Sequence, residues 1–128
     1  MAVTIVRLGT PRQPGEGLRI GTVRRLPRGV PKTQYARQNW FDVWLPNLSP
    51  SAELMRATDV VHDRRKWATF ERRFRSELKK PDASHLLDTL AALSHTTDFS
   101  IGCYCEDERV CHRSLLRGEL EKRGADIR

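Results

Sequence analysis

The stretch FSIGCYCEDERVCHRSLLRGEL, residues 99–120, contains the features that decide the fold. Its first seven residues form a short apolar run, which predicts a buried strand over residues 99–105. An acidic loop follows. Leucines at 115, 116 and 120 then share one face of a helix predicted over residues 111–124. A strand, a short loop and a helix in this order are typical of an α/β protein.

Two more strands are predicted near the start of the chain. Residues 3–8 are rich in β-branched side chains, and residues 18–25 alternate apolar and polar side chains. Helices separate these strands from the last one. The sequence therefore predicts one α/β domain over residues 1–128, a Rossmann-like sandwich with a mostly parallel sheet and helices packed on it. The strand over 18–25 and the last strand are expected to be parallel neighbours.

The segment between these strands contains three predicted helices. The first covers residues 48–55, with Ser49 as N-cap and Pro50 at the first helical position. The second runs from residue 63 to 80, and Pro81 ends it. The third covers residues 84–95, with Asp82 available as a cap. The apolar faces of the last two helices are formed by Trp67, Phe70, Phe74 and Leu78, and by Leu86, Leu87, Leu90 and Leu93.

Length and composition indicate a small cytoplasmic protein. The chain has 128 residues, of which 38% are hydrophobic and 30% charged, enough for one core. No apolar run approaches the roughly 20 residues that a membrane span needs, and no secretory signal opens the chain. Three cysteines clustered within nine residues are a poor disulfide framework. We expect no membrane partner, and a monomer or a homodimer.

The chain is basic, with a formal net charge of +7. Its lysines and arginines are scattered in pairs along the sequence. Such a charge raises nucleic-acid binding as one alternative function, although scattered basic residues also serve solubility and weak anion binding. No nucleotide-binding glycine motif or serine nucleophile motif is present, so the sequence indicates no particular cofactor.

The segment Cys111-His112-Arg113 opens the predicted last helix, directly after a strand and a loop. Ligands of α/β sheets bind at the carboxyl ends of strands, where helix N-termini favour anions. Ser114 adds a hydroxyl group. A helix N-terminus beside cationic side chains also lowers the pKa of a cysteine. We therefore expect an anion pocket in which Cys105 or Cys111 is a reactive thiol and His112 its partner or general base.

The segment RRLPRGVPK, residues 24–32, also follows a strand, so it is expected at the same edge of the sheet. Arg25, Arg28 and Lys32 supply cationic donors, and arginine in particular suits phosphate or carboxylate. Gly29 permits a tight turn or the close approach of a ligand to the backbone. The predicted ligand is an anionic, phosphate-bearing or nucleotide-like molecule held between this segment and Cys111-His112-Arg113.

The cysteines allow two other interpretations. Cys103, Cys105, Cys111 and His112 form a ligand set that zinc accepts. Against it, the spacing of Cys103 and Cys105 is tight, and neighbouring side chains of a helix diverge by about 100°. Cysteine is also a small residue that is commonly buried, so Cys103 is equally expected in the core. The sequence leaves the anion pocket, the metal site and the buried cysteine open.

Several of these motifs resemble a known bacterial family, the one catalogued as domain of unknown function 488. Its strand ending in cysteine and acid, followed by Cys-His-Arg, is similar to Cys105-Glu106 and residues 111–113. RRLPRGVPK resembles the Arg-x-Pro-Arg-Gly-Val segment of the family. DVWLPNLSPSAEL (42–54) and WATFERRFRSEL (67–78) also resemble family segments. The likeness covers nearly the whole chain.

The resemblance implies a Rossmann-like α/β fold and implies no particular reaction. One departure concerns the segment around Pro27. Many small members have an acid and a tryptophan before the proline, whereas this chain has Arg24 in the place of the acid and no tryptophan there. Any role of that acid is therefore not expected here.

Overall fold

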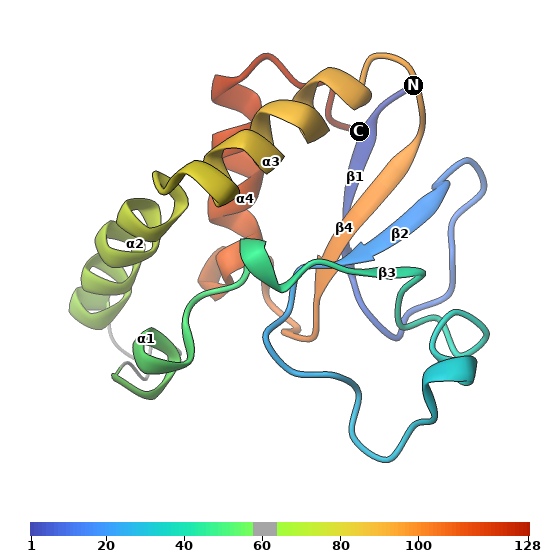
Figure 1. The fold of residues 1–128 in the computed structure, drawn as a ribbon, viewed down its shortest axis with the longest axis horizontal. Coiled ribbons are helices and arrows are strands. Elements are labelled where there is room, and N and C mark those ends of the chain that lie inside the picture. The colour runs from blue at the N-terminus through green and yellow to red at the C-terminus, as the bar shows by residue number, and fades with distance from the viewer. Residues whose placement is uncertain (58–63) are drawn as a thin grey trace.

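The computed structural model describes residues 1–57 and 64–128. Four parallel strands form one sheet in the order β1-β4-β2-β3 (Figure 1). Their bounds are Val3–Arg7 for β1, Leu18–Gly21 for β2, Val43–Trp44 for β3 and Phe99–Cys103 for β4. The parallel sheet and its helices confirm the predicted α/β fold. The predicted pairing of the second strand with the last one is also confirmed.

The central strand β4 sets the register of the sheet. Phe99 lies opposite both Val3 of β1 and Leu18 of β2, and all five residues of β4 are buried. Because side chains alternate along a strand, Phe99 and Ile101 face the helices, whereas Ser100 faces the other side. All strands run the same way, so their carboxyl ends meet at one edge.

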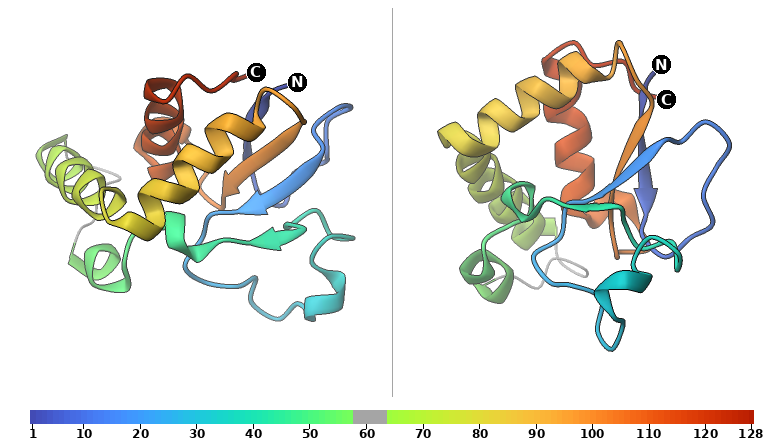
Figure 2. Two further views of the ribbon diagram at one scale, coloured as in Figure 1. Left: turned by 45° about the horizontal axis from the view of Figure 1, so that its top comes forward. Right: turned by 45° about the vertical axis from the view of Figure 1, so that its right-hand side comes forward.

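Four α-helices build the main core with the sheet. Their bounds are Ala52–Ala57 for α1, Arg64–Leu78 for α2, Pro81–Leu93 for α3 and His112–Lys122 for α4. Short 3₁₀ helices cover Lys32–Gln34, Pro46–Leu48 and Glu108–Val110. In Figure 2, α3 and α4 lie nearest the sheet, with α1 and α2 farther out. The core joins Phe74, Leu87 and Leu116 from three helices to Ile101 of β4.

Both strands next to the site are shorter than predicted. Strand β2 ends at Gly21 rather than residue 25, because the Val23 carbonyl accepts the indole N–H of Trp44 at 2.7 Å. Strand β4 ends at Cys103 rather than residue 105. The next two carbonyls accept arginine side chains, Arg7 at Tyr104 and Arg113 at Cys105, at 3.2 and 2.7 Å. At this edge of the sheet, backbone carbonyls therefore bond to side chains instead of to a neighbouring strand.

The first helix begins later in the chain than predicted. Helix α1 begins at Ala52, and the Ser51 hydroxyl accepts the Leu54 N–H at 3.1 Å as its cap. Ser49 is instead the C-cap of the 3₁₀ helix Pro46–Leu48, and its hydroxyl donates to the Pro46 carbonyl at 2.6 Å. Pro50 therefore precedes the helix instead of opening it.

The second and third helices were predicted with the correct core faces but inexact ends. Phe70, Phe74 and Leu78 are buried as expected, whereas the start predicted at residue 63 lies outside the described residues. Pro81 begins α3, where its missing N–H costs nothing. The prediction of an inward Leu93 was wrong: this side chain is 42% exposed at the end of α3.

The last helix begins one residue later than predicted. Cys111 is the N-cap of α4 and has extended backbone angles, φ −124° and ψ 146°. Leu115, Leu116 and Leu120 are buried, as predicted. Within the described ranges, no helix is both long and apolar enough to cross a bilayer.

Candidate functional site

The segments that follow β1, β2 and β4 meet at the carboxyl edge of the sheet. The Leu8 N–H donates to the Cys103 carbonyl at 2.9 Å, and the Thr22 N–H donates to the Gly102 carbonyl at 3.0 Å. The Thr22 hydroxyl donates to the same Gly102 carbonyl at 2.9 Å. These bonds hold the loops together at the edge where α/β proteins bind their ligands.

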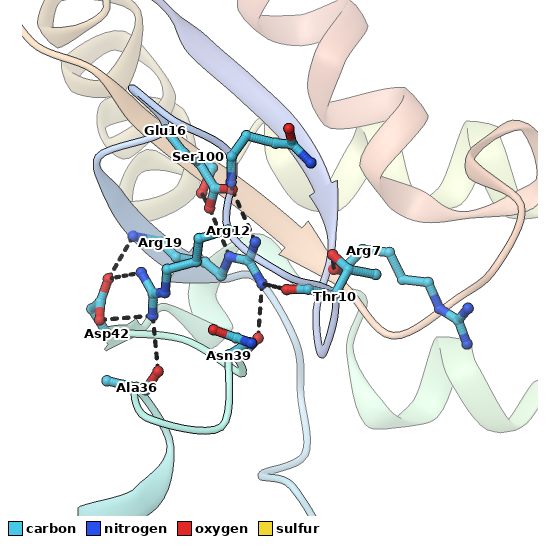
Figure 3. Close-up of polar contacts among 10 residues, drawn as sticks. Arg7, Thr10, Arg12, Glu16, Arg19, Ala36, Asn39, Asp42 and Ser100 are labelled. Atoms are coloured by element: carbon cyan, nitrogen blue, oxygen red, sulfur yellow. Dashed lines mark hydrogen bonds and ion pairs between the residues drawn. The ribbon is translucent and has the colours of Figure 1, made fainter.

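A buried ion pair supports this edge from the face of the sheet opposite the helices. Glu16 and Arg19 are 1% and 0% exposed, and the guanidinium donates to both carboxylate oxygens at 2.7 and 2.9 Å. The hydroxyl of Ser100 in β4 also donates to Glu16, at 2.7 Å (Figure 3). Burial alone would raise the pKa of Glu16, but the hydrogen bonds from Arg19 and Ser100 lower it to about 2.

The same guanidinium connects two loops to the ion pair. Its Nη1 donates to the carbonyls of Thr10 and Asn39 at 2.9 and 2.8 Å (Figure 3). Arg12 and Asp42 form an outer ion pair with distances of 2.7 and 3.0 Å, and Asp42 also accepts the Arg19 N–H. We call the contacts of Glu16 with Ser100 and Arg19, and of Arg19 with these loop residues, the Arg19 network. These contacts hold the loops that contain Thr10 and Asn39 in place.

The network positions Trp40 beside the end of β1. Asn39, which comes before it, has a φ of 63°, in the left-handed region that asparagine tolerates better than most residues. Gly9 also has a positive φ, and a Cβ there would lie 2.9 Å from Trp40 Cζ3. The indole packs edge-on against Tyr104, with ring centroids 5.8 Å apart. Glycine at position 9 thus lets an aromatic wall form.

A pocket of about 660 Å³ opens in front of this wall. Three of the residues that line it are arginines. None of the described residues that line it is acidic. We call it the arginine pocket. Its lining residues are Arg7, Leu8, Gly9, Thr10, Arg25, Leu26, Pro27, Arg28, Trp40 and Tyr104. They follow β1, β2 and β4 or precede β3, so every strand contributes to the pocket.

Several donors of the arginine pocket have no partner. The side chains of Arg25 and Arg28 are exposed and form no hydrogen bond or ion pair with the described residues. The buried indole N–H of Trp40 is also without a partner there. The Tyr104 hydroxyl, in contrast, donates to the Arg25 carbonyl at 2.8 Å and fixes the loop. The pocket therefore offers positive charge and the unused guanidinium N–H groups of Arg25 and Arg28.

The cysteines and His112 form a second candidate site behind the edge, which we call the thiol–imidazole cluster. The Sγ of Cys103 lies 3.7 Å from the Sγ of Cys105 and 3.7 Å from Nδ1 of His112. The Sγ of Cys111 lies 3.9 Å from the same nitrogen. Cys103, Cys111 and His112 are buried, and Cys105 is exposed. The sulfurs of Cys103 and Cys111 thus lie beside one imidazole, and the sulfur of Cys105 lies beside that of Cys103.

The surroundings of His112 define its tautomer. Its Nε2 lies 2.6 Å from the carbonyl oxygen of Thr22, which can only accept, so Nε2 carries the hydrogen. Nδ1 then presents a lone pair to the sulfurs. Burial lowers the pKa of His112, and the ring contacts Phe74 edge-on at 5.7 Å. The imidazole is therefore neutral and held in one orientation.

The three thiols have different acidities. The hydrogen bond from Cys103 lowers the pKa of Cys105, whereas the same bond raises the pKa of Cys103. Contacts with Cys103 and Cys105, together with burial, raise the pKa of Cys111. Any thiolate charge is therefore expected on Cys105, the cysteine that reaches solvent.

Arg113 holds the loop after β4 rather than facing the arginine pocket. It is 4% exposed, and its Nη2 donates to the carbonyls of Cys105 and Glu106 at 2.7 and 3.3 Å. Its Nε has no hydrogen-bond partner, and it pairs with no carboxylate of the described residues. A buried guanidinium without a direct ion pair is unusual.

The structure divides the predicted site residues between two places. Arg25 and Arg28 line the arginine pocket, but residues 111–113 do not, so the predicted arrangement across one pocket is not found. Lys32 lines a neighbouring pocket. Gly29 has a φ of 73°, which fits the predicted tight turn. The Ser114 hydroxyl donates to the Cys111 carbonyl at 2.9 Å within α4.

Sequence reasoning missed some important residues. Arg7 and Tyr104 line the arginine pocket, and their position next to strand ends could have indicated this. The pairing of Glu16 with Arg19 had no comparable signal, because charged residues near a loop are usually exposed. The Thr22 carbonyl that orients His112 is a backbone group and leaves no mark in the side-chain pattern.

Comparison with known families matches residues 3–124 to the model described as the active DUF488-N3 subclade. No curated protein and no solved structure matches the chain. The family match spans the strands, the helices and both candidate sites. It agrees with the resemblance drawn from the Cys-His-Arg motif and the arginine segment. The chain therefore belongs to the DUF488 family.

Proposed function

We propose that the arginine pocket binds an anionic small molecule that carries a flat ring, such as a nucleotide. The observation that carries this proposal is the composition of the pocket: three arginines and two aromatic side chains around about 660 Å³ at the carboxyl edge of a parallel sheet. Pockets of roughly 300–1,000 Å³ hold small ligands, and this edge is where α/β sheets bind them.

The charges of the pocket favour an anion. Arg25 and Arg28 have no competing carboxylate among the described residues, so their donors are available to phosphate. Arg7 has an ion-pair distance of 3.7 Å to Glu106, a side chain that is 84% exposed and therefore weakly held. A phosphate group could accept from all three guanidinium groups without displacing a strong ion pair.

The aromatic wall favours a planar group beside the anion. Trp40 and Tyr104 pack edge to face, and stacking of a ring on an aromatic side chain contributes about 1–3 kcal/mol for a base. The predicted catalytic roles of Cys111 and His112 are not part of this proposal, because neither residue lines the pocket.

Calorimetric titration tests the proposal with three probes: inorganic phosphate, a nucleoside monophosphate and the matching nucleoside. We expect the monophosphate to bind most tightly, because only it uses both the arginines and the aromatic wall. Arg28→Ala and Arg25→Ala should each weaken its binding about tenfold. The matched control is Arg72→Ala, which removes an exposed arginine of α2 and should leave the affinity unchanged.

Two results would overturn the proposal. One is the absence of binding for all three probes. The other is equal weakening by Arg28→Ala and Arg72→Ala, with binding to single-stranded DNA that falls steeply with salt. The second result would support the alternative of nucleic-acid binding through the overall charge of +7 instead.

A further inference from the structure

Three distances between ligand atoms of the thiol–imidazole cluster match those of a tetrahedral metal site. Zinc binds sulfur at about 2.3 Å and nitrogen at about 2.0–2.1 Å. Tetrahedral angles then place two sulfurs roughly 3.8 Å apart, and a sulfur and a nitrogen roughly 3.6 Å apart. The structure has 3.7 Å between the sulfurs of Cys103 and Cys105, and 3.7 and 3.9 Å from Nδ1 of His112 to Cys103 and Cys111.

The backbone explains how adjacent residues 111 and 112 reach the same point. Divergence of about 100° applies to neighbours that are both helical. Cys111 is instead an extended N-cap, and His112 is the first residue of α4, so their side chains converge. The ligand atoms of Cys103, Cys111 and His112 all lie within 4.8 Å of one another. The side chains of Cys111 and His112 therefore do not diverge as two neighbours within a helix would.

His112 is oriented as a metal ligand requires. Its Nε2–H donates to the Thr22 carbonyl, which leaves the lone pair of Nδ1 directed at the sulfurs. A ligand histidine commonly donates its other N–H to a carbonyl in this way, and the bond fixes both tautomer and ring orientation. Without a metal, the buried lone pair has only S–H groups as partners, and these are weak donors.

Arg113 supplies the charge that such a site lacks. A zinc ion with three thiolates and a neutral imidazole has a net charge of minus one. Arg113 is buried and has only the Cys105 and Glu106 carbonyls as partners, and its Nε has none in the described chain. A buried cation needs a counter-charge, and the metal–thiolate centre would provide one.

We propose that Cys103, Cys105, Cys111 and His112 bind one zinc ion. Each thiol loses its proton to solvent when its sulfur binds the metal, and His112 binds through Nδ1. Thiolate and imidazole ligands suit zinc, and four protein ligands leave no open position, so the site would be structural. It would hold the loop between β4 and α4 against the end of β2. The inference is independent of ligand binding in the arginine pocket.

Zinc analysis of untagged protein, purified under reducing conditions without chelator, tests the proposal. We expect one zinc per chain and thiols that alkylating reagents reach only after chelation. Cobalt substitution should produce sulfur-to-cobalt charge transfer in the near ultraviolet and the strong visible bands of tetrahedral Co²⁺. His112→Gln should abolish stoichiometric zinc. The matched control His85→Gln changes an exposed histidine of α3 and should retain it.

Cys105→Ser keeps the test decisive if the buried variants do not fold, because Cys105 is exposed. Loss of an outer-shell partner weakens metal binding about 10- to 100-fold, so loss of this ligand should cost at least as much. Equal zinc affinity in the folded parent and in folded Cys105→Ser would overturn the four-ligand site. Folded, reduced parent that binds no zinc, or cobalt spectra without thiolate charge transfer, would overturn the metal site altogether.

Discussion

Two buried polar clusters lie on opposite faces of β4, and they are built in opposite ways. On one face, Ser100 joins the Arg19 network, in which the carboxylate of Glu16 and the guanidinium of Arg19 have matched charges and matched donors. On the other face, Cys103 joins the thiol–imidazole cluster, in which the buried side chains offer electron pairs and weak S–H donors. The first cluster is complete and the second is not.

This difference separates a supporting role from a binding role. A buried ion pair with all of its hydrogen bonds made can rigidify the loops around it, and it needs no further partner. Soft ligand atoms around one point, beside the buried cation of Arg113, which forms no direct ion pair with the described residues, remain unsatisfied until something binds. We expect substitutions in the Arg19 network to act on stability, and those in the thiol–imidazole cluster to act on metal binding.

The largest expected effect is that of Arg19→Met. It leaves the buried carboxylate of Glu16 without its counter-charge, which should lower the free energy of unfolding by about 3–5 kcal/mol. Urea titration measures the change. The control Arg12→Met breaks the outer pair with Asp42, which is partly exposed, and should cost under about 1 kcal/mol. Equal losses in the two variants would contradict the view that burial makes the network strong.

A somewhat smaller effect should appear on acidification. The pKa of Glu16 is lowered from 4.5 to about 2 in the folded protein, so its ionised form stabilises the fold above pH 4.5. That contribution, roughly 3 kcal/mol, is lost as pH falls from about 4.5 to about 2. Urea titrations across this range should show a steeper loss in the parent than in Glu16→Gln. Parallel pH profiles would show that Glu16 does not titrate as described.

The smallest effect is expected in the other cluster. In reduced protein freed of metal, Cys103→Ala removes a small buried group and should cost only about 1 kcal/mol, the order expected for a modest core truncation. With zinc present, the parent alone should gain stability. Unfolding of both proteins by urea, with chelator and with added zinc, measures the two effects. A loss above about 3 kcal/mol without metal would mean that the thiols form a cohesive network of their own.

The parts of the fold that were predicted correctly depend on local patterns. The apolar stripe of Phe70, Phe74 and Leu78 repeats at helical spacing, and β4 is a continuous apolar run, so both elements could be identified from short windows. Errors were concentrated at element ends. Ser51 rather than Ser49 caps α1, and Ser51 is held there by hydrogen bonds to Glu77, which is 26 residues away, so a local window does not show it.

The candidate sites were predicted in composition but not in arrangement. Arg25 and Arg28 were correctly expected at a strand end, and the cysteines were correctly expected near His112. Their separation into a pocket and a buried cluster was not predicted, because it depends on how the loop after β2 and the start of α4 pack at the edge of the sheet. Trp40, Tyr104 and Arg7 complete the pocket from three loops that only the sheet brings together.

The sequence by itself determined the α/β class, the core faces of the helices and the types of side chain available for chemistry, because these follow from periodicity and from residue identity. Only the tertiary structure decided that Glu16 would be buried with Arg19, that the Thr22 carbonyl would orient His112, and that Cys111 would be extended. The Thr22 carbonyl is 90 residues from His112, and Ser100, which bonds Glu16, is 84 residues from it. Pairing of distant parallel strands brings such residues together, and no local window encodes that pairing.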